Sequence, residues 1–249
     1  MRDLAVAVLA LLACVSAAFG AESADCAVAA HLVSADYPLP RVAAALDQRR
    51  ELTVAVVGAG SSSLAGDATL AYPAQLERIL AKRLPGIKTK VVMNVKPRRT
   101  AEEMGEAFEK LLMDDKPNLV IWQTGTFDAI TGVDPDHYRE ALDEGVETLR
   151  EGGADVVLMN MQYSPRTESM IAIQAYADSM RLVSQQREVP LMDRFAVMKH
   201  WGEVGTFDFY KATRKVEMAG RIHECIAQLL ADVIQDGAKL SREQPKTVQ

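Results

Sequence analysis

Residues 52–63 read LTVAVVGAGSSS, an apolar and β-branched run that ends in a loop of glycine and serine. A short apolar run bounded by turn residues is typical of a strand buried on both faces. The segment from about Pro73 is predicted to form an amphipathic helix, whose apolar face carries Leu76, Ile79, Leu80 and Leu84. A strand, a loop and a helix in this order predict the first unit of a parallel sheet.

Outward from this unit, strands and helices keep alternating. Further apolar runs predict strands over 88–93, 119–122, 155–159 and 189–192. The remaining helices are predicted from Thr100, over 137–151, over 168–185 and from about Val216. Thr100 and Glu103 have the spacing of a capping box, which marks a helix start. The pattern predicts a flavodoxin-like, doubly wound five-stranded parallel sheet in a three-layer α/β/α domain.

The N-terminus has the features of a secretory signal peptide, predicted over residues 1–21. Its apolar run, residues 4–15, is too short for a membrane span, which needs about 20 apolar residues. One alternative is a buried N-terminal helix, which the polar residues 22–25 would interrupt. The other is a lipid anchor on Cys14. After cleavage we expect a periplasmic or secreted protein with no membrane span.

The mature chain is predicted to hold one domain. Residues 22–50 are an N-terminal extension packing on it, residues 51–237 are the domain, and residues 238–249 are a flexible tail. The formal net charge is -6, and Lys and Arg are scattered along the chain, so no nucleic-acid partner is expected. The sequence leaves the oligomeric state open.

Two cysteines remain after removal of the leader, Cys26 and Cys225, near opposite ends of the mature chain. In an oxidising compartment they can form a disulfide. The alternative is two unrelated buried thiols. We expect the disulfide.

Ligands in open parallel sheets bind beyond the carboxyl ends of the strands. The candidate site is therefore built from the segments that follow the predicted strands. These are residues 60–63, 96–99, 125–128 and 162–163, and Arg194.

Several segments together resemble the SGNH/GDSL hydrolases, and within them a periplasmic branch with Gly-Ser-Ser-Ser in place of Gly-Asp-Ser. The resemblance spans nearly the whole mature chain. It rests on Cys26, on residues 37–40, 60–66 and 72–73, on residues 117–126, 153–159 and 194–201, and on Cys225.

The resemblance implies a serine nucleophile on the first loop, and Ser62 takes that place. It also implies an oxyanion hole made by the nucleophile's amide, a second-loop glycine and a third-loop asparagine, and a late Asp-x-x-His pair. The substrates it implies are acyl or acetyl esters. Without the resemblance, three consecutive serines at a strand-to-helix turn would be interpreted as helix-capping residues.

The remaining family positions are replaced in this chain. The second loop, residues 94–99, is bulky and basic where a glycine is expected. Phe127 stands at the asparagine position, and losing one oxyanion donor typically costs about 10²–10³ in rate. Asp128 next to it is an acceptor and cannot replace that donor. The late aspartate and histidine positions fall on Arg214 and Glu217.

Another residue would therefore have to serve as the base for Ser62. The candidates are His200, after the fifth predicted strand, and Glu217 and Asp128. Glu217 is alternatively a structural ion-pair partner of Arg214, which favours its charged form. His223 flanks the apolar face of the last helix and is interpreted as a partly buried helix histidine.

Two function classes stay open, and the sequence does not decide whether the protein is an enzyme. The first is a serine ester hydrolase or acyltransferase acting on acyl or O-acetyl esters of cell-envelope or carbohydrate substrates, with reduced or lost activity. The second is a non-catalytic relative that binds an anionic or carbohydrate ligand in the same cleft. Its cationic candidates are Lys96, Arg98, Arg99 and Arg194.

The substrate-binding residues predicted for either class lie on the strand-exit loops. They are Ser61, Ser63, Arg98, Gly125, Thr126, Phe127, Tyr163 and Arg194. Dinucleotide binding through residues 58–60 is disfavoured, because Ser63 replaces the last glycine and strand two ends in Asn94 instead of an acid. We expect no cofactor and no metal.

Overall fold

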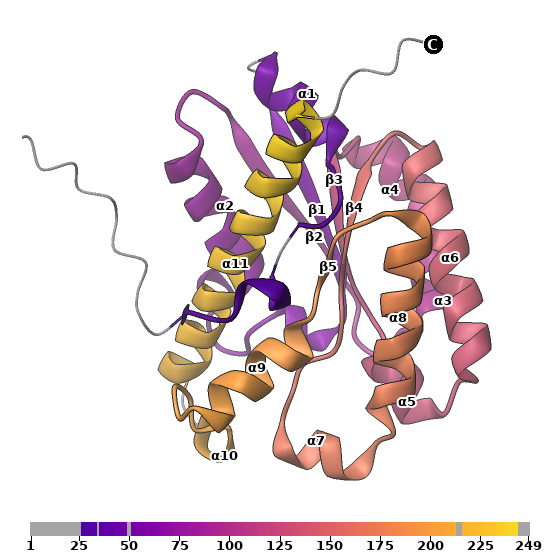
Figure 1. Cartoon of the computed structure of the whole chain (residues 1–249), viewed down its shortest axis with the longest axis vertical. Helices are drawn as coiled ribbons and strands as arrows, with labels where there is room; N and C mark the ends of the chain where they lie inside the picture. Colours follow the sequence, from indigo (N-terminus) through magenta and orange to yellow (C-terminus); the bar gives the residue numbers. More distant parts are fainter. Residues whose placement is uncertain (1–25, 34, 49–50, 213–215, 244–249) are drawn as a thin grey trace, which may run out of the picture.

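The computed structural model describes residues 26–33, 35–48, 51–212 and 216–243, so the predicted signal peptide lies outside the described residues. Its centre is a sheet of five parallel strands in the order β2-β1-β3-β4-β5 (Figure 1). The strands are β1 (Leu52–Gly58), β2 (Thr89–Val95), β3 (Leu119–Gln123), β4 (Asp155–Met159) and β5 (Leu191–Met192). The predicted doubly wound α/β fold is confirmed.

Helices cover both faces of the sheet because its strands are apolar on both sides. In β1, Val54 and Val56 belong to one core cluster, while Ala55 and Val57 belong to the other. The first core is closed by α1 (Pro40–Asp47), α2 (Tyr72–Arg83) and α11 (Val216–Glu243), and the second by α3 (Ala101–Gly105), α4 (Phe108–Asp115), α6 (Pro135–Glu151) and α8 (Ile173–Arg187) (Figure 1). All three layers are therefore formed as the sequence pattern predicts.

Two predicted helices are divided in the structure. The helix from Thr100 starts with the predicted capping box, but it is split into α3 and α4 at residues 106–107. The helix predicted over 168–185 is divided between α7 (Pro165–Met170) and α8. Ser164 caps α7 by accepting from the Thr167 amide at 3.1 Å. Local capping therefore set boundaries that apolar periodicity did not reveal.

Helix α11 extends six residues beyond the predicted domain end at 237. Ala238 is fully buried in the first core, which explains why the helix continues there instead of giving way to a tail. Among the described residues, no helix combines the length and the apolarity needed to cross a membrane.

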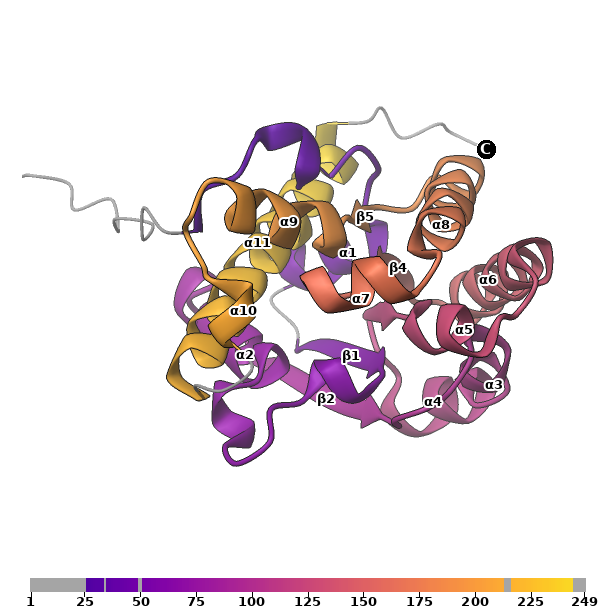
Figure 2. The ribbon, with the colours of Figure 1, turned by 90° about the horizontal axis from the view of Figure 1, so that it is seen from below.

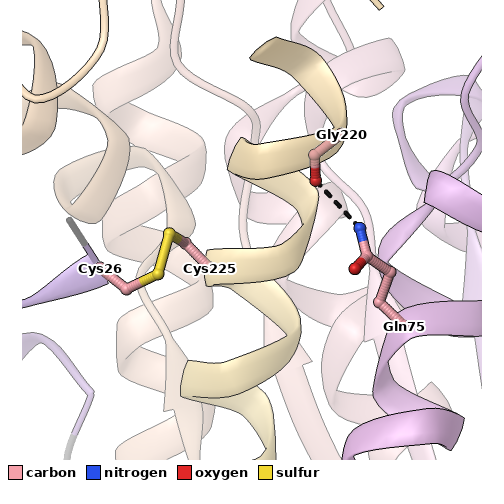
Figure 3. The surroundings of a disulfide bond; sticks show 4 residues. All are labelled: Cys26, Gln75, Gly220 and Cys225. Atoms are coloured by element: carbon pink, nitrogen blue, oxygen red, sulfur yellow. Dashed lines mark hydrogen bonds between the residues drawn. A yellow bond between two sulfur atoms is a disulfide. The ribbon is translucent and has the colours of Figure 1, made fainter. Parts of the chain in front are cut away.

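The N-terminal extension is fastened to α11. Cys26 and Cys225 form the predicted disulfide across a separation of 199 residues (Figure 3). The Leu39 amide donates to the Gly237 carbonyl at 2.9 Å, and Gln75 of α2 donates to the Gly220 carbonyl at 2.9 Å. Helix α11 is thus tied to the N-terminal extension by the disulfide and to α2 by the glutamine side chain.

Short helices gather at the carboxyl ends of the strands (Figure 2). The turn η3 (Gly60–Ser62) follows β1, α5 (Thr126–Thr131) follows β3, and α9 (Arg194–Glu203) follows β5. Helices α7 and α10 (Phe209–Ala212) lie at the same end. The predicted site segments after β1, β3, β4 and β5 therefore share one edge of the domain.

Candidate functional site

A pocket of about 330 Å³ opens at this edge, between η3, the segment after β4, α9 and α11. Its polar wall is formed by Ser63, Gln162, Ser164, Arg194 and His223. Small-molecule sites typically occupy about 300–1,000 Å³, so this pocket suits a small ligand. Groups of His, Cys, Asp and Glu suited to a metal ion are not found among the described residues.

Ser62 lies under this surface and is fully buried. Its hydroxyl donates to Gln123 Oε1 at 2.8 Å and accepts from the Tyr72 hydroxyl at 3.3 Å. Its amide donates to the Ala59 carbonyl at 2.9 Å, within η3. The Ser62 hydroxyl proton therefore faces the carboxamide oxygen of Gln123. The backbone amide of Ser62 is already used by a hydrogen bond within the turn.

Gln123, the last residue of β3, is the centre of a buried polar network. Its Oε1 accepts from Ser62, from the Tyr72 hydroxyl at 3.2 Å and from Arg194 Nη1 at 3.0 Å. Its Nε2 donates to Ser61 Oγ at 2.6 Å. A carboxamide accepts hydrogen bonds but does not take up protons near neutral pH, so it fixes the Ser62 hydroxyl without activating it.

Arg194 begins α9 and is fully buried. Besides Gln123, it donates to the Ser61 carbonyl at 3.3 Å and from Nη2 to Gln162 Oε1 at 3.1 Å. Its guanidinium carbon lies 5.8 Å from the centre of the Tyr72 ring. Burial lowers the pKa of Arg194 to about 10, so the group stays charged at neutral pH.

His223 faces the same pocket from α11 and is also buried. Its Nδ1 accepts from the Tyr72 amide at 2.9 Å, so the neutral ring carries its proton on Nε2. Burial, and then the nearby Arg194 charge, lower the pKa of His223 to about 3. His223 is therefore a neutral hydrogen-bond donor toward the pocket and a poor general base.

Acidification is expected to destabilise the fold through His223. The pKa of His223 falls from 6.5 to about 3 on folding, so between these values only the unfolded chain binds the proton. The His223 contribution to the free energy of unfolding should then drop by about 1.4 kcal/mol per pH unit as the pH falls from about 6 to about 4. Urea unfolding of the wild type and of His223→Asn, whose Oδ1 can accept the Tyr72 amide, measures this contribution. Equal slopes in the two proteins would contradict it.

Asp128 is a buried residue of α5. Its Oδ1 accepts from the Ala101 amide at 2.8 Å, at the start of α3, and its Oδ2 from Thr124 Oγ1 at 3.5 Å. Burial raises the pKa of the Asp128 carboxyl. Its contacts join α5 to α3 and do not reach Ser62.

The other predicted bases are placed apart from Ser62. His200 is partly exposed on α9, and Glu217 is exposed in the first turn of α11. Neither forms a hydrogen bond with Ser62 among the residues the structure describes. Arg214, the predicted partner of Glu217, lies outside those residues.

The predicted binding residues fall into separate groups. Ser63, Tyr163 and Arg194 line the pocket, and Ser61 lies behind it in the Gln123 network. Gly125, Thr126 and Phe127 form the start of α5 and are not part of the pocket lining.

The basic second loop lies at a different hollow. Arg98 is exposed with a left-handed backbone (φ 58°). Lys96 and Arg99 line a second pocket of about 390 Å³, which they share with Glu103, Glu106, Asp114 and Asp115. These carboxylates offset the basic charge of the second loop. Arg194 lines the first pocket, so the expected cationic residues do not form one anion-binding site.

Sequence reasoning placed Gln162 on a candidate site segment, but it did not select Gln123, Tyr72 or His223 as site residues. The signal for Gln123 was a polar residue that continues the apolar run of β3 directly. His223 had no such signal, because its role depends on α11 packing against α2.

Comparison with known proteins places this geometry among esterase-like folds. The profile of the Non-GDSL lipase-like family matches residues 25–240. No curated protein sequence matches significantly.

Three solved structures illustrate the likeness. The crystal structure of TesA is 24% identical, with a TM-score of 0.58 over 73% of this chain and 99% of that one. AlinE4, a SGNH-hydrolase family esterase, is 21% identical, with a TM-score of 0.51 over 62% and 78%. A mutant of Axe2, a Geobacillus acetyl-xylooligosaccharide esterase, is 16% identical, with a TM-score of 0.59 over 74% and 94%. The resemblance to SGNH hydrolases is confirmed at the level of the fold.

Proposed function

The chain belongs to the Non-GDSL lipase-like family, and from this premise we propose that it is an exported protein binding acyl or O-acetyl esters in the pocket beside Ser63. The esters are of cell-envelope or carbohydrate origin, and hydrolysis through Ser62 is reduced or lost. A substrate of this class is supported by the likeness to AlinE4, an esterase, and to Axe2, an acetyl-xylooligosaccharide esterase.

The network around Ser62 carries the proposal of weak or absent catalysis. A serine hydroxyl becomes a useful nucleophile when a neighbouring base removes its proton. Here the hydroxyl is held by Gln123 and Tyr72, and His223 is neutral with Nδ1 occupied. The Ser62 amide, the expected oxyanion donor, is bonded to Ala59. The Ser62 hydroxyl and the Ser62 amide are therefore both used in hydrogen bonds that stabilise the fold.

Export is supported by the disulfide between Cys26 and Cys225. Structural disulfides persist in oxidising compartments such as the periplasm and the extracellular space. We propose a periplasmic or secreted location on this basis, together with the signal-peptide pattern of residues 1–21.

Hydrolysis of p-nitrophenyl acetate and butyrate tests the proposal. We expect the wild type and Ser62→Ala to release p-nitrophenol at the same rate, close to that of buffer. Ser63→Ala is the matched control, because it removes a hydroxyl from the pocket wall instead of from the buried network. A wild-type rate about 10²-fold or more above that of Ser62→Ala would establish Ser62 as a working nucleophile and overturn the proposal.

A further inference from the structure

Arg194 is a buried cation without a counter-charge in the described part of the chain. It is fully buried, and its acceptors there are carbonyl and carboxamide oxygens. Buried charges in proteins are normally paired, because burial removes their hydration. A positive charge maintained in this way beside a pocket points to a ligand that brings the negative charge.

One edge of the Arg194 guanidinium carries an N–H without a hydrogen-bond partner among the described residues. Nη1 and Nη2 share the Ser61 carbonyl, and Nη1 also reaches Gln123. The buried Nε has no hydrogen-bond partner. Its neighbour Nη2 is bonded to Gln162, a partly exposed residue of the pocket wall. Nε and Nη2 form the side of the fork that binds a carboxylate with two parallel hydrogen bonds.

The pocket is amphiphilic. Beyond its polar wall, it is lined by apolar side chains from the loop after η3 and from α9, α10 and α11, namely Leu64, Met198, Phe209, Val216, Ala219 and Ile222. Asp and Glu are absent from the described lining, so Arg194 gives the pocket a single positive charge. The wall thus matches a molecule with one negative head and a short apolar chain.

We propose that this pocket binds an amphiphilic monocarboxylate, whose carboxylate takes the Nε and Nη2 edge of Arg194 and whose chain lies along the apolar wall of α11. The inference rests on the proposed function, since it names the ligand class of the same pocket. Such an acid is what remains of an acyl ester after its hydrolysis.

The carboxylate of the ligand would replace the Gln162 side chain as the acceptor of Arg194 Nη2. An ionised acceptor forms a shorter and stronger hydrogen bond to a guanidinium than a neutral amide does. The incoming head group would displace Gln162 Oε1 from Nη2 and satisfy Nε at the same time. A phosphate dianion suits the pocket less well, because its second charge would be buried without a partner.

Isothermal titration of the wild type with octanoate, methyl octanoate and octyl phosphate tests the inference. We expect octanoate to bind at least tenfold more tightly than either of the others. Equal or tighter binding of methyl octanoate, or tighter binding of octyl phosphate, would overturn the carboxylate assignment. Such results leave the proposed function in place, which the hydrolysis comparison of Ser62→Ala tests separately.

Substitutions in and beside the pocket test whether octanoate binds at Arg194. Arg194→Met should weaken octanoate binding at least tenfold, whereas Arg166→Met, an equal charge change on exposed α7, should leave it unchanged. Gln162→Ala removes the competing acceptor and should tighten binding.

Because a buried arginine is risky to replace, Ala219→Phe provides a second test. It narrows the apolar wall while Arg194 stays in place, and it should also weaken octanoate binding at least tenfold. Octanoate binding that is unaffected in both Ala219→Phe and Gln162→Ala would overturn the inference.

Discussion

Gln123→Leu is expected to lower the free energy of unfolding by at least about 2 kcal/mol. The buried Ser62 hydroxyl loses its acceptor, which costs about 1–3 kcal/mol, and the charged Arg194 loses a hydrogen bond worth about 1.5–3 kcal/mol. Tyr72 keeps Ser62 Oγ and Arg194 keeps the Ser61 carbonyl as acceptors. The substitution removes the oxygen that accepts from Ser62, Tyr72 and Arg194. Leucine is similar in size, so the loss comes from the hydrogen bonds and not from a cavity. Urea unfolding followed by circular dichroism measures the change.

Gln123→Glu is the matched control. Its carboxylate keeps the acceptor oxygen and adds a negative charge beside Arg194. We expect it to retain most of the stability that Gln123→Leu loses. If the two variants unfold alike, the network around Gln123 does not stabilise the fold as described.

Gly125→Ala is expected to destabilise the protein by a similar amount. The residue precedes α5 with φ of 98°, a left-handed conformation that costs a residue with a side chain about 1–2 kcal/mol. A Cβ there would also lie 2.7 Å from Met161 Sδ and 2.8 Å from the Tyr138 hydroxyl. Overpacking of this kind costs about 1–3 kcal/mol more.

Gly66→Ala separates the two contributions. Gly66 has the same φ of 98°, but its Cβ would meet no atom within 4 Å among the described residues. It should therefore show only the backbone cost in thermal and urea unfolding. Equal destabilisation by Gly66→Ala and Gly125→Ala would contradict the close packing assigned to Gly125.

Much of the fold could be predicted from local patterns. The strand over residues 52–57 and the capping box at Thr100 depend on neighbouring residues, and both are present. Helix boundaries were harder to predict. The start of α7 depends on the Ser164 cap, and the division between α7 and α8 lies where the backbone of Ile171 is extended, which apolar periodicity does not reveal. The reach of α11 past residue 237 depends on long-range packing of Ala238.

The site was harder to predict than the fold. The sequence placed three serines on one loop, but their orientation decides their chemistry: Ser62 is buried against Gln123, whereas Ser63 faces the pocket. The Arg194 contacts join residues 71 and 133 positions apart, which no local pattern reveals. Similarly, the second-loop cations appear in the sequence as an anion site, while in space they lie beside the acidic residues of α3 and α4.

The central claim is that the Ser62 hydroxyl is held by the Gln123 network and not activated as a nucleophile. Intact-mass spectrometry of the mature protein after incubation with a fluorophosphonate probe tests it most directly, with an active serine esterase labelled in parallel. The account predicts an unmodified mass for the wild type. A stoichiometric adduct that maps to Ser62 and is lost in Ser62→Ala would contradict it.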